Sequence, residues 1–440
     1  MFKKIFILSF ILSLGISFSE DKPSKSVIFK NVNIFDGKSN QLLLNKNVLI
    51  EDNKIVSISN DQILNASATV LNAEGKTLMP GMIDVHVHLI FGSMTMEEML
   101  SPDLTPEKVI EKASVQSEKM LMRGFTAVRD VGGPVFLLKK YIDQDKIPGP
   151  RIWPSGATVS QTSGHGDLRA PDENSRRFHG ELSRAEKYGA TIIADGRDEV
   201  LTAVRENLRF GASQIKLMAG GGTSSAYDPI DVTQYTLDEM KAAVEAADDW
   251  GTYVTVHAYT DKSVQRAIDA GVKCVEHGQL LSEETLLLMK EKDVWLSCQN
   301  LVEDTPDMDP LRREKRKPVI DGQKKIWPLA KKLNIKLAWG TDFLFEPLLN
   351  DQQNEYILKL SEWFTPFEIL KMVTYDNAQL LALSGLRSPY AGNLGVVEQG
   401  ALADLILIEG NPLEDINLIS QYNDKFVLIM KDGKIVKNIL

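Results

Sequence analysis

The stretch GMIDVHVHL, residues 81–89, reads as an apolar strand that carries two histidines near its end. Side chains alternate across a strand, so His86 and His88 point to the same side. Burying two imidazoles is unfavourable unless both find partners. The pair therefore indicates a shared ligand at the point where the strand ends, and a metal ion is the ligand that best explains it.

The centre of the chain alternates short apolar strands with amphipathic helices. The predicted strands are MIDVHVHL (82–89), FTAVRDV (125–131), RIWPSG (151–156), SQIKLMAG (213–220), YVTVHA (253–258), CVEHG (274–278), VWLSCQ (294–299) and KLAWGTD (336–342). One helix is signalled by Thr236 as N-cap, Glu239 three residues later and Gly251 as terminator. Eight βα units predict an α/β fold, a TIM (β/α)8 barrel, in which catalysis occurs where strands end and loops begin.

Both ends of the chain read as antiparallel β structure. Residues 24–80 contain short alternating runs broken by turn residues, and residues 386–440 contain strands separated by glycine and proline. Two such segments at opposite ends of a chain often complete one small domain around a central insertion. The sequence thus predicts a small β-sandwich domain from residues 24–80 and 386–440, with the barrel at 81–385.

The first residues, MFKKIFILSFILSLGISFSE, have the features of a secretory signal. Lys3 and Lys4 precede an apolar run that is short for a membrane span, and small residues follow it. We expect cleavage after Ser19, which makes residues 1–19 the signal peptide. The mature protein would be periplasmic or secreted, with no stable membrane association. An uncleaved anchor is the alternative.

The overall composition is that of a soluble protein with no nucleic-acid partner. The chain of 440 residues has a net charge of −10 and a hydrophobic fraction of 43%, and an acidic balance disfavours binding to nucleic acid. The short basic run LRREKRK at 311–317 is interpreted as a solvated helix face. Cys274 and Cys298 are too few for a disulfide framework.

Several polar side chains are expected at one rim of the barrel, where strands end. They are His86, His88, Lys216, His257, His277 and Asp342. A lone histidine on an apolar strand is more often a hydrogen-bonded core residue, and this would be the preferred interpretation of His257 or His277 alone. Four imidazoles and a carboxylate at one rim instead suit zinc or a similar divalent ion.

Lys216 is unusual because an ammonium in an apolar strand is costly and would be repelled by metal cations. A neutral lysine amine can react with carbon dioxide to give a carbamate, an anion whose two oxygens can bridge two metals. The alternative is a lysine that extends its charge to the barrel mouth. The adjacent AGGG, residues 219–222, would let a backbone or ligand approach closely.

These motifs resemble the amidohydrolase superfamily, in the subtype with a binuclear metal centre and a carboxylated lysine. PGMIDVHVHL, GASQIKLMAGGG, TVHA, EHG and GTD match in this order, and the resemblance covers the mature chain. Within the superfamily the chain is similar to the prolidase-like and imidazolonepropionase-like branch, which includes Xaa-Pro dipeptidases. TSGHGDLR (162–169) and DPIDVTQYT (228–236) resemble its substrate loops. This implies that His165 and Tyr235 bind the substrate carbonyl or carboxylate, with a loop-stabilising role as the alternative.

The resemblance also implies a mechanism. His86, His88 and Asp342 would hold one metal, and His257 and His277 a second, with Zn²⁺ expected at both. Carboxylated Lys216 and a hydroxide would bridge the metals, and Asp342 would carry a proton to the leaving amine. The expected substrate is a small molecule, a dipeptide such as Xaa-Pro or an N-acyl amino acid.

Other functions remain open at this point. A cyclic-amide or imidazolone hydrolase is one alternative, although Lys216 argues against the imidazolone type, whose members use a single metal without the lysine. An aryl-amide hydrolase is a second, and a non-catalytic scaffold a third, against which the complete ligand set argues. The segment NLVEDTPDMDPLRREKRK, residues 300–317, matches no pattern, so side-chain specificity is not assigned. Self-association of the chain is also left open.

Overall fold

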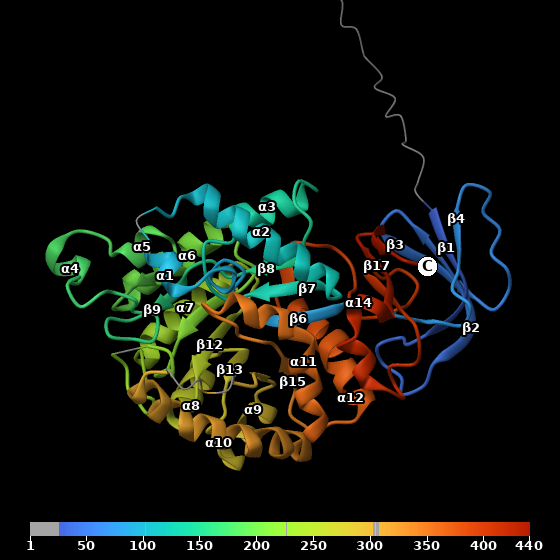
Figure 1. The fold of residues 1–440 in the computed structure, drawn as a ribbon. Coiled ribbons are helices and arrows are strands. Elements are labelled where there is room, and N and C mark those ends of the chain that lie inside the picture. Colours follow the sequence, from blue (N-terminus) through green and yellow to red (C-terminus); the bar gives the residue numbers. More distant parts are fainter. Residues whose placement is uncertain (1–25, 102, 226, 302–303, 305–307) are drawn as a thin grey trace, which may run out of the picture.

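Parallel strands surrounded by helices make up the larger part of the computed structural model, and a mostly antiparallel sheet lies beside them (Figure 1). The structure describes residues 26–440 apart from residues 102, 226, 302–303 and 305–307. The predicted signal peptide, residues 1–19, lies outside the described residues and stays a prediction. Within the described residues, no helix has both the length and the apolar character needed to cross a membrane.

Every strand predicted for the centre is present, and two short ones are added. The strands are β6 (Met82–Val87), β7 (Phe125–Asp130), β8 (Arg151–Pro154), β9 (Thr158–Ser160), β10 (Thr191–Ile193), β11 (Ile215–Met218), β12 (Val254–Ala258), β13 (Cys274–His277), β14 (Trp295–Cys298) and β15 (Leu337–Trp339). All pair in parallel, which matches the predicted α/β class. The unpredicted strands are β9 and β10.

The described ladders form two sheets rather than one closed barrel. Their orders are β6-β7-β8 and β10-β9-β11-β12-β13-β14-β15. A single backbone hydrogen bond spans each gap, from Ser213 N–H to Pro154 O at 2.7 Å and from Asp342 N–H to His86 O at 2.8 Å. The break after β8 has a local cause, because Pro154 lacks an N–H and Gly156 turns the chain with a φ of 75°.

Helices connect these strands. The longer ones are α2 (Pro106–Met122), α3 (Phe136–Asp143), α6 (Arg197–Phe210), α7 (Leu237–Asp249), α8 (Asp261–Ala270), α9 (Glu283–Glu291) and α10 (Pro310–Leu333). The helix predicted at Thr236 is confirmed as α7: Thr236 and Glu239 form the capping box, and Gly251 follows with a φ of 68°.

Shorter helices complete the connections. They are η1 (Phe91–Ser93), α1 (Met96–Leu100), α4 (Arg176–His179), α5 (Arg184–Lys187), η2 (Pro347–Gln352), α11 (Gln353–Leu358), η3 (Lys359–Glu362), α12 (Pro366–Lys371), the π-helical turn η4 (Met372–Asp376), α13 (Asn377–Ala382), η5 (Gly385–Arg387), η6 (Ile416–Ile419) and α14 (Tyr422–Lys425).

The two ends of the chain meet in one eight-stranded sheet. Its strands are β1 (Ser26–Ile34), β2 (Leu43–Glu51), β3 (Lys54–Ser59), β4 (Thr69–Asn72), β5 (Thr77–Pro80), β16 (Leu405–Ile408), β17 (Phe426–Lys431) and β18 (Lys434–Asn438). The order is β18-β17-β16-β5-β1-β2-β3, with β4 also paired to β1. β5 joins the two ends of the chain, because it pairs with β1 on one edge and with β16 on the other. The β-sandwich form of this part stays a prediction.

Candidate metal centre

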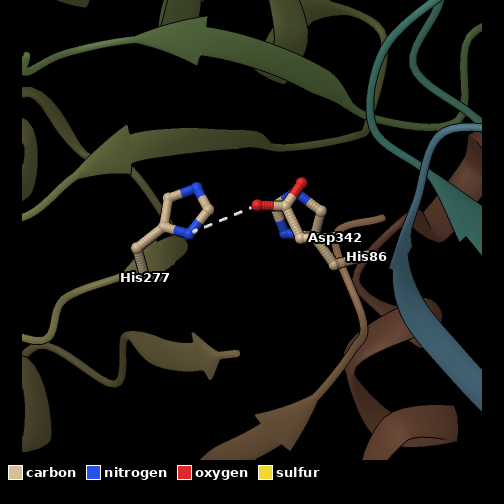
Figure 2. A group of neighbouring side chains, drawn as sticks. All are labelled: His86, His277 and Asp342. Atoms are coloured by element: carbon tan, nitrogen blue, oxygen red, sulfur yellow. Dashed lines mark ion pairs between the residues drawn. The ribbon is translucent and has the colours of Figure 1, made fainter. Parts of the chain in front are cut away.

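Asp342, which follows β15, lies among three histidines from two strands. Its Oδ1 is 3.2 Å from His86 Nε2 and 3.3 Å from His88 Nε2, and its Oδ2 is 3.9 Å from His277 Nδ1. Figure 2 shows the His86, His277 and Asp342 side chains converging. One ligand atom from each of these three lies within 4.8 Å of the others. The end of β6, the end of β13 and the turn after β15 therefore supply one cluster of metal-binding atoms.

Hydrogen bonds fix which nitrogen of each β6 histidine faces the cluster. His86 Nδ1–H donates to Glu276 Oε2 at 2.8 Å, and His88 Nδ1–H donates to the Gly132 carbonyl at 3.0 Å. Both rings therefore present Nε2 to Asp342. Metal-binding histidines commonly donate their other ring N–H in this way, which orients the ring and raises its basicity.

Glu276 orients the His86 ring by accepting its Nδ1–H hydrogen bond. Its side chain is fully buried, accepts from Arg129 Nη2 at 2.6 Å and also accepts from Thr255 Oγ1. Burial alone would raise the pKa of Glu276, but the Arg129 guanidinium and His86 hold it well below its usual range. The group that accepts the hydrogen bond from His86 Nδ1–H is therefore an ionised carboxylate. Sequence reasoning missed this role, although Glu276 directly precedes His277 in the CVEHG motif.

His257 and His277 form a second pair of candidate ligands. Their ring centroids lie 4.5 Å apart, and His257 Nε2–H donates to the Gly221 carbonyl at 3.1 Å, which leaves Nδ1 free. The buried Nδ1 of His277 has no hydrogen-bond partner among the described residues. Burial holds the pKa of both imidazoles well below the usual value. Neutral rings with unused nitrogens are the donors that zinc and similar ions require.

Lys216 lies in β11 and lines the same cavity, which has a volume of about 110 Å³. It is 2% exposed, and its amine makes no hydrogen bond or ion pair with any described residue. Burial lowers the pKa of Lys216. Burial thus shifts Lys216 toward the neutral amine, the form that reacts with carbon dioxide, and the side chain does not extend its charge to solvent.

His165 reaches the cavity, as the resemblance implies. Its ring stacks on His257 with centroids 3.9 Å apart, and its Nδ1 lies 2.7 Å from Ser225 Oγ. The close approach depends on Gly222, where a Cβ would fall 1.9 Å from the His165 ring. The group that approaches the glycine run closely is therefore the His165 side chain, whereas a backbone or ligand was expected.

Tyr235 does not reach the cavity. Its phenol donates to the Ala194 carbonyl at 3.0 Å, and its side chain is 3% exposed within the hydrophobic core. The predicted role of Tyr235 in substrate binding is therefore corrected to the loop-stabilising alternative. The backbone explains the orientation, because Tyr235 has a φ of 59° where the chain turns into α7.

The residues that follow β14 and those at the start of α10 contribute side chains that sequence reasoning did not assign. Gln299, Asn300, Arg312 and Arg316 line the cavity. Lys315 Nζ donates to the carbonyls of Ser225 at 2.7 Å and Asp228 at 2.8 Å. The interpretation of LRREKRK as a solvated face is wrong for Arg312, Lys315 and Arg316. Their spacing of three and four places them on one side of α10, a signal that the sequence does contain.

Comparisons with known proteins identify the family. The model of the Amidohydrolase family matches residues 77–439. Ochratoxinase from Aspergillus niger is 33% identical over 377 residues, which cover 82% of this chain and 75% of that protein. A solved prolidase complexed with N-methylphosphonate-L-proline has a TM-score of 0.86 at 31% identity, covering 94% of this chain and 100% of that one.

A solved Xaa-Pro dipeptidase with bound methionine in the active site has a TM-score of 0.78 at 28% identity, covering 94% of this chain and 100% of that one. These neighbours imply a TIM barrel with a second domain, which agrees with the parallel strands and the separate sheet. The chain belongs to the amidohydrolase family, in its prolidase-like branch, and is a hydrolase that acts on carbon–nitrogen bonds.

Proposed function

We propose that this chain hydrolyses an amide whose amine side carries a free carboxylate, as in an Xaa-Pro dipeptide or an N-acyl amino acid. Arg312 is the observation that carries the proposal. It lines the metal cavity, and its buried Nε has no hydrogen-bond partner among the described residues. An unsatisfied buried donor is unfavourable, and a carboxylate is the partner that a guanidinium pairs with best. The prolidase and dipeptidase among the neighbours support a substrate of this kind.

The candidate ligands would hold two divalent metal ions, with zinc as the proposed metal. His86, His88 and Asp342 would bind one, His257 and His277 the other, and Lys216, carboxylated on Nζ, would stand between them. Bound metals of this kind polarise a carbonyl and lower the pKa of water, so that hydroxide is available near neutral pH. The donor chemistry fits, since burial holds the pKa of His257 and His277 well below the usual value and His277 Nδ1 has no hydrogen-bond partner within the described residues.

The remaining steps belong to the side chains of this protein. Arg312 would hold the substrate carboxylate and thereby orient the scissile carbonyl toward Asp342. The Asp342 carboxylate would take a proton from the attacking water and release it to the leaving nitrogen. The carbonyl carbon gains a hydroxyl as the carbon–nitrogen bond breaks, and the nitrogen gains the proton. His165, stacked on His257, would position the substrate at the same wall of the cavity.

The test compares substrates that have a free carboxylate with matched carboxamides. We expect wild type to hydrolyse Xaa-Pro dipeptides or N-acyl amino acids and to discriminate against their C-terminal amides. Arg312→Met should lower kcat/KM for the carboxylate substrates by about 10- to 100-fold, as expected for a lost hydrogen bond to a charged group. Arg313→Met, at the exposed neighbouring position, is the control. Equal kcat/KM for carboxylate and carboxamide in the wild type would refute the proposal.

A further inference from the structure

A second cavity of about 380 Å³ lies beside the metal cavity and is here called the apolar chamber. Its apolar lining includes Phe91, Met96, Met99, Tyr188, Tyr227 and Phe345. Several of these residues come from segments that follow β6, β11 and β15, the ends of the strands that carry the metal-binding side chains. Its size falls in the range of small-molecule sites, about 300–1,000 Å³.

The apolar chamber adjoins the metal cavity. Ser224 lines both cavities, and the consecutive residues Leu344 and Phe345 line one each. Aromatic rings also connect the two: Phe91 lies 6.3 Å from the candidate ligand His88 and 5.7 Å from Phe345, centroid to centroid. The two cavities therefore share the part of the wall that contains Ser224.

The lining indicates an apolar occupant. Met96, Tyr188 and Tyr227 are 45%, 44% and 51% exposed, so large apolar side chains gather at the rim of a hollow. Two of the charged residues there pair with each other, since Arg169 Nε donates to Asp167 Oδ1 at 2.7 Å, and Glu173 accepts from the backbone N–H groups of Ala170 and Arg184. Both carboxylates of the described lining thus have hydrogen-bond donors, and Arg184 is an exposed cation at the rim. The apolar side chains remain as surface to be covered.

We propose that the apolar chamber is the acyl subsite, which receives a large apolar group, aromatic or medium-chain aliphatic, on the acyl side of the scissile amide. This rests on the proposed function, in which Arg312 holds the carboxylate of the amine side. Arg312 lines the metal cavity but not the chamber, so the two ends of such a substrate have separate sites. The preferred substrate class is then N-acyl amino acids with bulky apolar acyl groups.

The kinetic test uses metal-loaded full-length enzyme and N-acyl-L-alanines from acetyl to octanoyl. The wild-type kcat/KM should rise by about fourfold per added methylene until the chamber is filled. Ala185 lines the chamber, and Ala185→Trp should reduce the ratio of kcat/KM for octanoyl over acetyl by at least about tenfold. Ala66→Trp, at an exposed position of the β sheet domain, is the matched control. Thermal unfolding of both variants checks that the fold is retained.

A binding measurement separates this inference from the proposed reaction. Calorimetry on the same metal-loaded protein should show that octanoate binds more tightly than acetate in wild type, and that Ala185→Trp removes most of the difference. This result would support the chamber even if no acyl amino acid were hydrolysed, in which case the proposed function alone would fail. Equal affinity for the two acids, or a chain-length effect that survives in Ala185→Trp, would overturn the subsite. So would a preference for bulk on the amine side that Ala185→Trp abolishes.

Discussion

Asp342 connects the candidate metal ligands to the chemistry. Its carboxylate faces His86, His88 and His277, and its backbone holds a left-handed φ of 56°, which aspartate tolerates better than most residues. Burial would raise the pKa of Asp342, but the neighbouring His86 and His88 hold it well below the usual value. The side chain is thus a carboxylate at every physiological pH before substrate arrives.

Asp342→Asn should retain much of the bound metal and lose turnover. The amide oxygen can still face a metal, but it cannot move a proton, and general acid–base catalysis is typically worth about 10²–10⁴-fold in rate. The measurements are metal content per chain and kcat. A metal-replete Asp342→Asn enzyme with nearly normal kcat would remove Asp342 from the proton-transfer role.

Lys216→Met should keep the fold and lose metal and activity. Methionine has a similar volume, and volume-conserving swaps in a core cost less than about 1.5 kcal/mol. No carbamate can form, so we expect the metal content to fall from about two ions per chain and turnover to be nearly abolished. Metal analysis, circular dichroism and kinetics check this result. Two ions per chain with normal turnover in Lys216→Met would show that no bridging carbamate is needed.

The single sequence predicted the cluster residues because their types and strand positions are unusual. The HxH pair and the lysine in an apolar strand would be unfavourable without a role, and all of them lie at the cavity. Tyr235 and Glu276 show the limit of this reasoning. The direction of Tyr235 depends on its left-handed backbone, and the role of Glu276 depends on contacts with His86 and Arg129 that come from other strands.

The segments after β9 and β11 form the wall of the cavity together. Gly222, after β11, permits the His165 ring to lie on His257. Lys315 of α10 holds the segment after β11 in place by donating hydrogen bonds to the Ser225 and Asp228 carbonyls. Three elements that are distant in sequence therefore set the position of one candidate substrate-binding histidine.

Gly222→Ala should displace His165 and lower kcat/KM by about 10- to 100-fold, since small misplacements in an active site have effects of this order. Gly220→Ala is the matched control, because a Cβ there meets its nearest atom at 3.3 Å, a contact that needs only a slight adjustment. Steady-state kinetics of both variants check the prediction, with unfolding curves to show that both fold. Equal kcat/KM for the two variants would contradict a role for the His165 position.

The secondary-structure predictions were confirmed for elements whose hydrophobic periodicity extends over enough residues to be recognised. Strands with polar residues at their ends and a capped helix such as α7 carry local signals. The three-residue strands β9 and β10 are too short to show alternation. The inward side of α10 was missed because its basic residues suggested exposure, although Arg316 is 2% exposed and Lys315 binds two carbonyls.

The two parts of the molecule are joined by a buried ion cluster. Arg151 begins β8 and pairs with Asp404 at 2.8 Å and Asp432 at 2.6 Å, both from the C-terminal part of the eight-stranded sheet. Arg151 and Asp404 are nearly inaccessible to solvent. Each neutralises the charge of the other, which would be strongly unfavourable if it were buried without a partner. The sequence predicted strands at both ends of the chain, but it contained no sign of this contact between the two parts.

Arg151→Met should lower the free energy of unfolding by about 3–5 kcal/mol, because it leaves buried Asp404 without its partner. Lys434→Met is the control: Lys434 pairs with Asp145 at 2.6 Å between exposed side chains, and its loss should cost less than about 1 kcal/mol. Urea unfolding followed by fluorescence measures both. Equal effects of the two substitutions would show that the buried cluster contributes no more to stability than an exposed ion pair.

The position of β5 has a consequence for how the protein is made. β5 pairs with β1 near the start of the chain and with β16 near its end. A nascent chain therefore carries β1–β5 for some 325 residues before their last partners are translated. Until then β5 presents an unpaired edge, the kind of surface on which unfinished chains aggregate. A premature stop between Asp342 and Leu405 would accordingly yield a product with an open sheet and an exposed apolar edge, and cellular quality control should recognise it even though every candidate metal ligand is present.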